Sequence, residues 1–211
     1  MGAVSRIDSD ERWARAIEIP LCLALLTFFA PLMLVVALVI KLSDGGPILF
    51  AHRRLGRGGH SFGCLKFRSM VPDAEPRLQA LLASDPKART EWERDHKLTN
   101  DPRITPIGEF LRRSSLDELP QLFNVLRGEM SLVGPRPIVE AEVTRYRRYY
   151  AFYCQVRPGV TGLWQVSGRN DVSYRRRVAL DVVYARSRCV GLYFKILLAT
   201  APAVLGRRGA R

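Results

Sequence analysis

The chain has 211 residues, of which 33 are Lys or Arg and 20 are Asp or Glu, so its formal net charge is +13. This length suits one ordinary domain with an appendage and is too short for two full-sized domains. The positive charge favours a polyanionic partner, which leaves nucleic acids, anionic membrane surfaces and phosphorylated substrates open, while the dispersed 4 Cys and 3 His argue against a Cys/His zinc site or a disulfide framework.

An uncharged run of 22 residues, 19–40, lies near the N-terminus. As a helix it would cover about 33 Å, which matches the hydrocarbon thickness of a bilayer. Pro31 lies near its middle and removes a backbone hydrogen bond, so we expect the helix to kink there. The residues alone leave two topologies open: a kinked helix that spans the membrane, and a re-entrant segment that enters and leaves on one face.

Residues 44–70 are predicted to form a turn followed by short strands. The glycines between residues 56 and 59 fit the turn of a β-hairpin better than a phosphate-binding loop. Lys66 and Arg68 occupy alternate positions, so on a strand both side chains would point to the same face.

Two further regions suit the membrane interface. Between residues 72 and 97, sparse apolar residues among charges predict two helices, separated at Pro86, that either face solvent or contact the interface. Helices predicted over 138–154 and 171–186 then lead to the apolar stretch Val190–Leu205, which is short for a span and is expected to lie in the interface.

Asp117 and Glu118 are adjacent carboxylates in a basic part of the chain, at a predicted helix start. Ser115 and Glu118 fit a capping box, which would make Glu118 structural, but Pro120 would then fall where its missing N–H is needed. With Asp117 as the cap, Pro120 costs no hydrogen bond, and the helix would end at Gly128. The helix dipole and nearby arginines would then keep Asp117 ionised and attract a phosphate, which suggests phosphoryl chemistry.

A series of motifs follows along the chain: Lys66-Phe67-Arg68-Ser69-Met70, Asp101-Pro102-Arg103-Ile104-Thr105, the stretch 110–122 around Asp117-Glu118-Leu119-Pro120, Ser131-Leu132-Val133-Gly134-Pro135-Arg136-Pro137, and the stretch 157–169 from Arg157-Pro158-Gly159 to Gly168-Arg169. In this order they resemble the bacterial sugar transferases. These are small monotopic phosphoglycosyl transferases that attach a hexose 1-phosphate to a polyprenyl phosphate.

The resemblance implies a two-step transfer of hexose 1-phosphate from a UDP-hexose to a polyprenyl phosphate such as undecaprenyl phosphate, with release of UMP. Asp117 would attack the phosphorus bonded to the sugar and form a phosphosugar-aspartate intermediate, with Mg²⁺ held at Asp117 and Glu118. Arg112 would bind phosphate. To this polar site we add Lys66, Arg68, Arg136 and Arg169. Such a reaction is the first membrane step in making a bacterial exopolysaccharide, capsule, O-antigen of lipopolysaccharide, or glycoprotein.

The resemblance also implies a mostly α-helical fold with a small β-hairpin. Residues 1–43 would form a re-entrant membrane helix-break-helix, and residues 44–211 a catalytic domain with interfacial amphipathic helices on the cytoplasmic face of the bacterial inner membrane. Pro31 would mark the break, where Ala30 replaces the serine frequent in the family and Thr27 is a candidate to satisfy the freed carbonyl. Expected partners are a UDP-hexose, a polyprenyl phosphate and membrane lipids, with no nucleic acid, and self-association stays open.

Two functions of other classes also fit parts of the sequence. A membrane-anchored protein that binds a polyanion would use the charge of +13 directly, but it leaves the carboxylate pair and the apolar segment unexplained. A non-catalytic scaffold for glycan enzymes is the other alternative. An Asp117→Asn variant separates these from the enzyme, because only the enzyme would lose UMP release.

Overall fold

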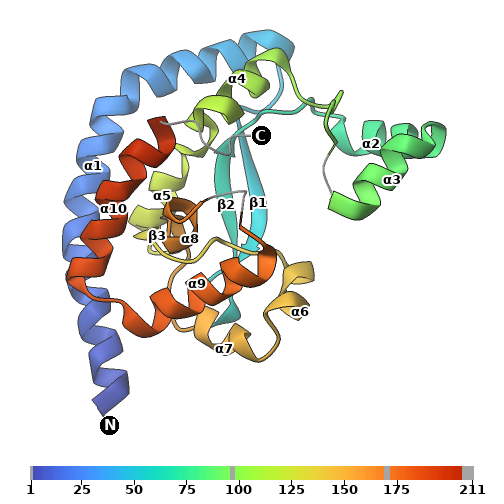
Figure 1. Cartoon of the computed structure of the whole chain (residues 1–211). Helices are drawn as coiled ribbons and strands as arrows, with labels where there is room; N and C mark the ends of the chain where they lie inside the picture. Colours follow the sequence, from blue (N-terminus) through green and yellow to red (C-terminus); the bar gives the residue numbers. More distant parts are fainter. Residues whose placement is uncertain (1, 96–97, 169–171, 206–211) are drawn as a thin grey trace.

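The computed structural model describes residues 2–95, 98–168 and 172–205. They form a mostly helical molecule around a small antiparallel β-hairpin, as predicted (Figure 1). The long helix α1 (Gly2–Asp44) runs along one side, and α10 (Val190–Leu205) lies beside it.

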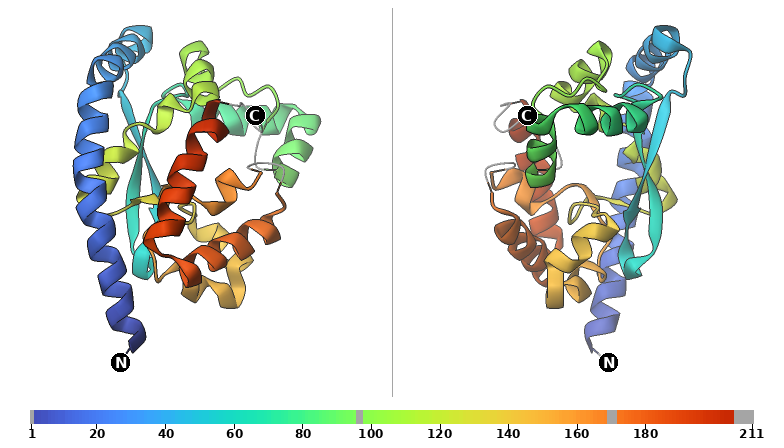
Figure 2. Two further views of the ribbon diagram at one scale, coloured as in Figure 1. Left: turned by 60° about the vertical axis from the view of Figure 1, so that its left-hand side comes forward. Right: turned by 90° about the vertical axis from the view of Figure 1, so that its right-hand side faces the viewer.

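Helix α1 is bent rather than straight (Figures 1 and 2). Its backbone is helical throughout with Pro20 and Pro31 inside it, so the predicted break at Pro31 is wrong in form: the helix bends without interruption. A proline inside a helix is sufficient cause for a bend because it removes a hydrogen bond and crowds the preceding turn. The stretch Arg12–Asp44 is long and apolar enough to cross a membrane. An 18-residue segment within it has a mean hydropathy of 2.8, and only 11% of that segment is buried.

The N-terminal part of α1 is fixed to the rest of the chain by polar contacts. Arg15 donates hydrogen bonds to the carbonyl oxygens of Val125 and Leu126, the latter at 2.9 Å. Glu18 is fully buried and accepts a hydrogen bond from the backbone N–H of Leu132 at 3.0 Å. A buried carboxylate is costly unless hydrogen-bonded, so these contacts define where α1 lies.

The C-terminal part of α1 packs elsewhere. Val36 and Ile40 form a buried cluster with Phe67 at the end of the hairpin and Leu111 on α4 (Pro106–Ser114). Both parts of α1 therefore contact the same body of the molecule.

The hairpin pairs β1 (Leu49–Leu55) with β2 (Ser61–Phe67) in antiparallel register, with Leu49 opposite Phe67 and Leu55 opposite Ser61. Gly58 and Gly59 adopt positive φ in the turn, which confirms the hairpin interpretation of the glycines. Directly opposite residues share a face, so this register places the side chains of Phe50, His52 and Arg54 on the same face as that of Lys66.

The chain after α4 departs from the predicted helix start. Ser115 ends α4 in the left-handed region with φ 59°, and a turn of 3-10 helix, η2 (Leu116–Glu118), precedes α5 (Gln121–Arg127). Neither the capping box nor Asp117 as a cap is formed, because Asp117 lies inside the 3-10 turn and α5 begins only after Pro120. Gly128 ends α5 with φ 80°, as predicted.

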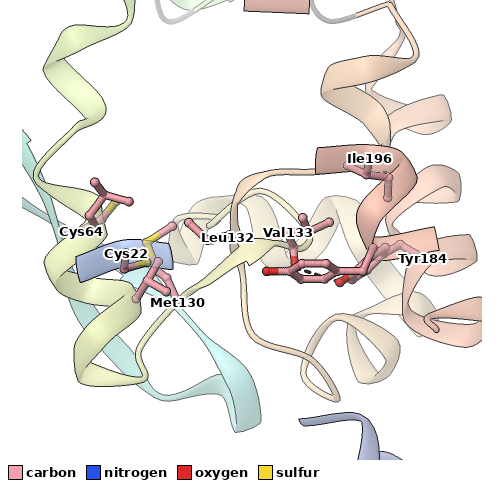
Figure 3. Close-up of a cluster of buried hydrophobic side chains, with 10 residues drawn as sticks. Cys22, Cys64, Met130, Leu132, Val133, Tyr184 and Ile196 are labelled. Carbon is pink, nitrogen blue, oxygen red and sulfur yellow. Dashed lines mark hydrogen bonds between the residues drawn. The ribbon is translucent and has the colours of Figure 1, made fainter. Parts of the chain in front are cut away.

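A second, unpredicted sheet lies in the core. The short strands β3 (Ser131–Val133) and β4 (Gly159–Thr161) pair in parallel, and their backbones approach closely at Gly134 and Gly159, where a side chain would overlap main-chain atoms. Figure 3 shows the surrounding apolar cluster, in which Cys22 of α1 lies against Met130.

The predicted continuous helix over 138–154 is wrong. The structure has two single-turn helices there, α6 (Val143–Tyr146) and α7 (Tyr150–Tyr153), joined by a 3-10 turn that begins at Arg147 with φ 48°. Tyr146 and Tyr153 are fully buried, so packing around their rings replaces helical continuity.

The C-terminal helices follow the expected ranges. After the single-turn helix α8 (Leu163–Val166), α9 (Tyr174–Ser187) begins at a Ser173 cap, and the start predicted at residue 171 lies outside the described residues. Helix α10 buries Tyr193 and Ile196 in the main core and exposes Val190 and Phe194, so one of its faces is a core face.

Helices α2 (Ala74–Ser84) and α3 (Pro86–Asp95) form an arm that extends away from the body (Figure 1). Pro86 is the first residue of α3, so the predicted separation is confirmed. The guanidinium of Arg103 lies 5.0 Å above the ring of Trp92 and fastens the arm to the following segment.

The close approach of β3 and β4 predicts a large effect of one methyl group. Gly159→Ala places a Cβ against the backbone nitrogen of Gly134, so we expect it to lower the free energy of unfolding by about 3 kcal/mol. Gly191→Ala on α10 is the matched control: its Cβ meets nothing within 4 Å and should change stability by at most about 1 kcal/mol, in the stabilising direction. Thermal unfolding in detergent micelles measures both, and equal effects of the two substitutions would contradict the packing.

Candidate active site

The carboxylate pair occupies η2, between α4 and α5. Asp117 is 6% exposed, whereas the side chain of Glu118 is 39% exposed. The flanking Leu116 and Leu119 pack against the cluster that contains Val36 and Ile40 of α1. One carboxylate is therefore enclosed and its neighbour is accessible, and the turn that carries them rests on the membrane-type helix.

Lys66 on β2 contacts both carboxylates. Its Nζ lies 3.3 Å from Oδ2 of Asp117 and 2.6 Å from Oε1 of Glu118. Because the hairpin and η2 are about fifty residues apart in sequence, only the fold brings this lysine to the pair. The prediction that Lys66 belongs to the polar site is consistent with this geometry.

The electrostatic state of Asp117 differs from the predicted one. Burial raises the pKa of Asp117 above its usual value; Glu118 raises it further, and Lys66 and Arg112 oppose the rise. The expected lowering by a helix start is wrong because Asp117 is enclosed and does not cap a helix. Burial lowers the pKa of Lys66, but Glu118 and Asp117 outweigh it and raise the pKa, so the ammonium group stays charged.

Arg112 on α4 also acts on the carboxylate pair. Its Nε donates a hydrogen bond to Oγ of Ser69 at 2.8 Å, and its charge is close enough to lower the pKa of Asp117. Within the described residues no other hydrogen bond of its guanidinium is found, which leaves N–H groups for an anionic ligand.

Among the described residues, Arg68 forms no hydrogen bond or ion pair with the carboxylate pair. It is 8% exposed and forms an ion pair with Asp44 at the end of α1, while its backbone N–H bonds to the carbonyl of Ile48 at 2.9 Å. Because β2 ends at Phe67, Arg68 follows the strand and is engaged by Asp44, and its part in a site with Lys66 stays a prediction. Its buried Nη1 has no hydrogen-bond partner in the described structure.

Arg136 is exposed on the turn that follows β3, with its guanidinium 5.8 Å above the ring of Trp164. It does not contact Asp117, but its charge lowers the pKa of His52 on β1, as does that of Lys66. Arg136 and Lys66 therefore border one cation-rich region. Arg169 lies outside the described residues.

Sequence reasoning missed His52 and Arg54 in this region. Nη2 of Arg54 lies 3.1 Å from Nδ1 of His52, and burial, Arg54, Lys66 and Arg136 lower the pKa of His52, so the imidazole is neutral near pH 7. The available signal was the hairpin register, because glycines between two strands of equal length place these residues on the face of Lys66.

The pair of carboxylates suits a magnesium ion that is completed by a substrate. Mg²⁺ is usually bound by one or two carboxylates together with phosphate oxygens and water, and Glu118 is accessible. Among the described residues no group of three or more His, Cys, Asp or Glu forms a self-sufficient metal cage. The residues thus fit a metal shared with a phosphate ligand.

Comparison of the sequence with known proteins identifies its family. The description "Bacterial sugar transferase" belongs to a family model that matches residues 9–207. The chain belongs to the bacterial sugar transferase family. It is 52% identical over 196 residues to an undecaprenyl-phosphate galactose phosphotransferase of Salmonella typhimurium. The aligned region covers 93% of this chain and 41% of that protein.

Two other relatives differ in length. The UDP-galactose-lipid carrier transferase of Erwinia amylovora is 50% identical over 196 residues, an alignment that covers 93% of this chain and 41% of the relative. The exopolysaccharide production protein ExoY of Rhizobium meliloti is 49% identical over 185 residues, an alignment that covers 88% of this chain and 82% of the relative. The chain therefore spans less than half of the first two relatives and most of the third.

The pKa shifts predict opposite pH dependences for two buried aspartates. Folding raises the pKa of Asp117 above 3.8, so ionisation destabilises the folded chain as pH rises from 3.8 through the folded pKa. The stability of Asp117→Asn relative to the unmodified chain should increase over that window and then stay level. Urea unfolding at a series of pH values measures this.

Asp101 provides the control. It accepts hydrogen bonds from Arg103 at 2.8 and 2.7 Å, and although burial opposes it, this arginine lowers the pKa of Asp101 below 3.8. Asp101→Asn should cost about 2 kcal/mol at every pH above 3.8 and less only below it, as the native carboxylate protonates. The same pH dependence for both variants would contradict the assignment.

Proposed function

We propose that this chain transfers a hexose 1-phosphate from a UDP-sugar to a polyprenyl phosphate such as undecaprenyl phosphate and releases UMP. The observation that carries the proposal is the enclosed carboxylate of Asp117 beside Lys66, on a turn that packs against the long apolar helix. The relatives support it by name, since they are described as undecaprenyl-phosphate galactose phosphotransferase and UDP-galactose-lipid carrier transferase. The ExoY relative supports a place in exopolysaccharide production.

In the first step a carboxylate oxygen of Asp117 attacks the phosphorus bonded to the sugar. The new bond joins that oxygen to phosphorus, and the bond between this phosphorus and the bridging oxygen of the diphosphate breaks, so UMP leaves with the electron pair. In the second step an oxygen of the polyprenyl phosphate attacks the same phosphorus and releases Asp117. Two steps spare the site from holding a nucleotide sugar and a lipid together.

Lys66 and Arg112 have distinct roles in this reaction. A carboxylate attacks only when ionised, and burial opposes ionisation of Asp117, so the nearby positive charges keep it available. Arg112, whose guanidinium bonds only to Ser69 among the described residues, would bind the phosphoryl oxygens on which charge accumulates. Glu118 and Asp117 would hold Mg²⁺, which supplies positive charge to offset the diphosphate.

We further propose that α1 is re-entrant and that the catalytic body lies on the cytoplasmic face of the bacterial inner membrane. Arg15 at one end of the apolar segment bonds to α5, and Asp44 at the other end pairs with Arg68. If α1 were a straight helix that spans the bilayer, its two ends would lie about 30 Å apart on opposite sides of the membrane. Only one of the two ends could then contact the catalytic body. A helix whose two ends contact the same body favours entry and exit on one face.

Exposed apolar side chains support contact with lipid near the carboxylate pair. Phe28 and Leu34 of α1 are 76% and 71% exposed, and Phe110 on α4 is 57% exposed. Phe50 on β1, directly opposite Lys66, is 53% exposed. Aromatic rings of this kind favour a membrane interface, where a lipid phosphate would meet Asp117.

The central prediction concerns the nucleophile. Asp117→Asn should reduce UMP release from a UDP-hexose in the presence of polyprenyl phosphate by at least about a thousandfold, because an amide cannot form the intermediate. Asp73→Asn is the matched control, since Asp73 is an exposed carboxylate on the arm and pairs only with Arg77 among the described residues. A panel of UDP-hexoses with detergent-solubilised full-length chain measures both, and full activity of Asp117→Asn would overturn the mechanism.

The topology has its own test. In a background with Cys189→Ser, which removes the exposed cysteine, Arg12→Cys and Ser61→Cys each introduce an exposed thiol, one before the apolar segment and one in the catalytic body. An impermeant maleimide added to right-side-out and inverted vesicles should label both thiols only in inverted vesicles. Labelling of the two positions from opposite faces would establish a span.

A further inference from the structure

Glu142 is a largely buried carboxylate that lies between two arginines from distant parts of the chain. Its Oε2 lies 3.7 Å from Nη1 of Arg54 on β1, and its Oε1 lies 3.5 Å from Nη2 of Arg177 on α9. The side chains of Arg54, Glu142 and Arg177 are only 14%, 19% and 15% exposed. A carboxylate in this place offsets two positive charges that water screens poorly.

The same groups hold the turn that carries Arg136. Oε2 of Glu142 accepts a hydrogen bond from the backbone N–H of Val139 at 3.1 Å, and Nη1 of Arg54 donates to the carbonyl of Pro137 at 3.2 Å. Prolines on both sides of Arg136 further restrict the backbone. The side chain of Arg136 is exposed and forms no hydrogen bond or ion pair within the described residues.

Trp164 connects Arg136 to the same network. The guanidinium of Arg177 lies 5.2 Å from the centre of the indole ring, and that of Arg136 lies 5.8 Å from it. Because Trp164 is 6% exposed, its ring is a fixed surface against which both guanidinium groups rest. Glu142 therefore influences Arg136 through its turn and through Arg177.

Repulsion among positive groups makes this anchoring necessary. Burial lowers the pKa of Arg54, Arg136 lowers it further, and Glu142 opposes both. The pKa of His52 is lowered by burial, Arg54, Lys66 and Arg136, and again Glu142 opposes. Without Glu142 the positive groups would repel one another, and the exposed side chain of Arg136 is the one with room to move away.

We propose that Glu142 is a positioning residue for donor binding: it holds Arg54, Arg177 and the 134–139 turn so that Arg136 meets the anionic nucleotide portion of the sugar donor. This inference rests on the proposed function. Glu142 itself touches no substrate and acts through Arg136.

Steady-state UMP release by the full-length chain tests the proposal. Glu142→Gln removes the charge but keeps an acceptor for Val139, and it should raise KM for the UDP-sugar by about tenfold while kcat changes less than about twofold. Glu140→Gln removes an equal charge from an exposed neighbour outside the network and should leave both constants unchanged. An unchanged KM in Glu142→Gln would overturn the proposal.

A double-mutant cycle separates positioning from general stabilisation. In an Arg136→Ala background, Glu142→Gln should raise KM by less than about twofold, because the residue through which it acts is absent. Independent, multiplying effects of the two substitutions would overturn the proposal. Glu142→Asp keeps the charge with a shorter reach and should give a smaller rise in KM, so it serves as the second variant if Glu142→Gln fails to fold.

Equilibrium binding of UMP distinguishes this inference from the proposed function. Glu142→Gln should raise the Kd for UMP by the same factor by which it raises KM, and this measurement involves no turnover. If UMP binds the unmodified chain and Glu142→Gln equally well, the inference fails whatever the turnover. If UMP binding responds as expected but the unmodified chain releases no UMP from any UDP-hexose, the proposed function alone fails.

Discussion

The contact of Lys66 with Asp117 and Glu118 is the interaction on which the site depends. Asp117 is enclosed and lies next to Glu118, and because burial and this neighbouring carboxylate both raise the pKa of Asp117, a nearby positive charge is needed to favour its ionised form. Lys66 supplies that charge from the hairpin, at 3.3 and 2.6 Å. The hairpin, the left-handed residue Ser115 and the short 3-10 turn thus have a common role, which is to bring one ammonium group to one pair of acids.

The membrane-type helix is part of the body that holds the site rather than a separate anchor. Cys22 lies in the main core with Met130, and Ile40 lies in the cluster that supports Leu116 beside the carboxylates. Removing α1 would therefore expose core surface as well as remove a helix long and apolar enough to cross a membrane. The division into residues 1–43 and 44–211 describes composition better than packing.

The sequence predicted the parts of the fold that local chemistry determines. The hairpin turn, the helix break at Pro86 and the end of α5 at Gly128 follow from glycine and proline geometry. The parallel strands β3 and β4, by contrast, are three residues each and too short for a periodic pattern. The pKa of Asp117 and the engagement of Arg68 by Asp44 depend on tertiary burial and on where β2 ends, which no local pattern contains.

The ion pair between Asp44 and Arg68 joins the last residue of the apolar helix to the residue that follows β2. The guanidinium of Arg68 fills the space beside Gly46, so a methyl group on Gly46 would collide with it. The connection from α1 to β1, which contains Gly46, is therefore tightly packed against Arg68. Lys66 lies two residues before Arg68, on β2. One ion pair therefore links the end of α1 to the residue next to β2, so a displacement of that helix end would also displace the strand whose Lys66 lies beside Asp117.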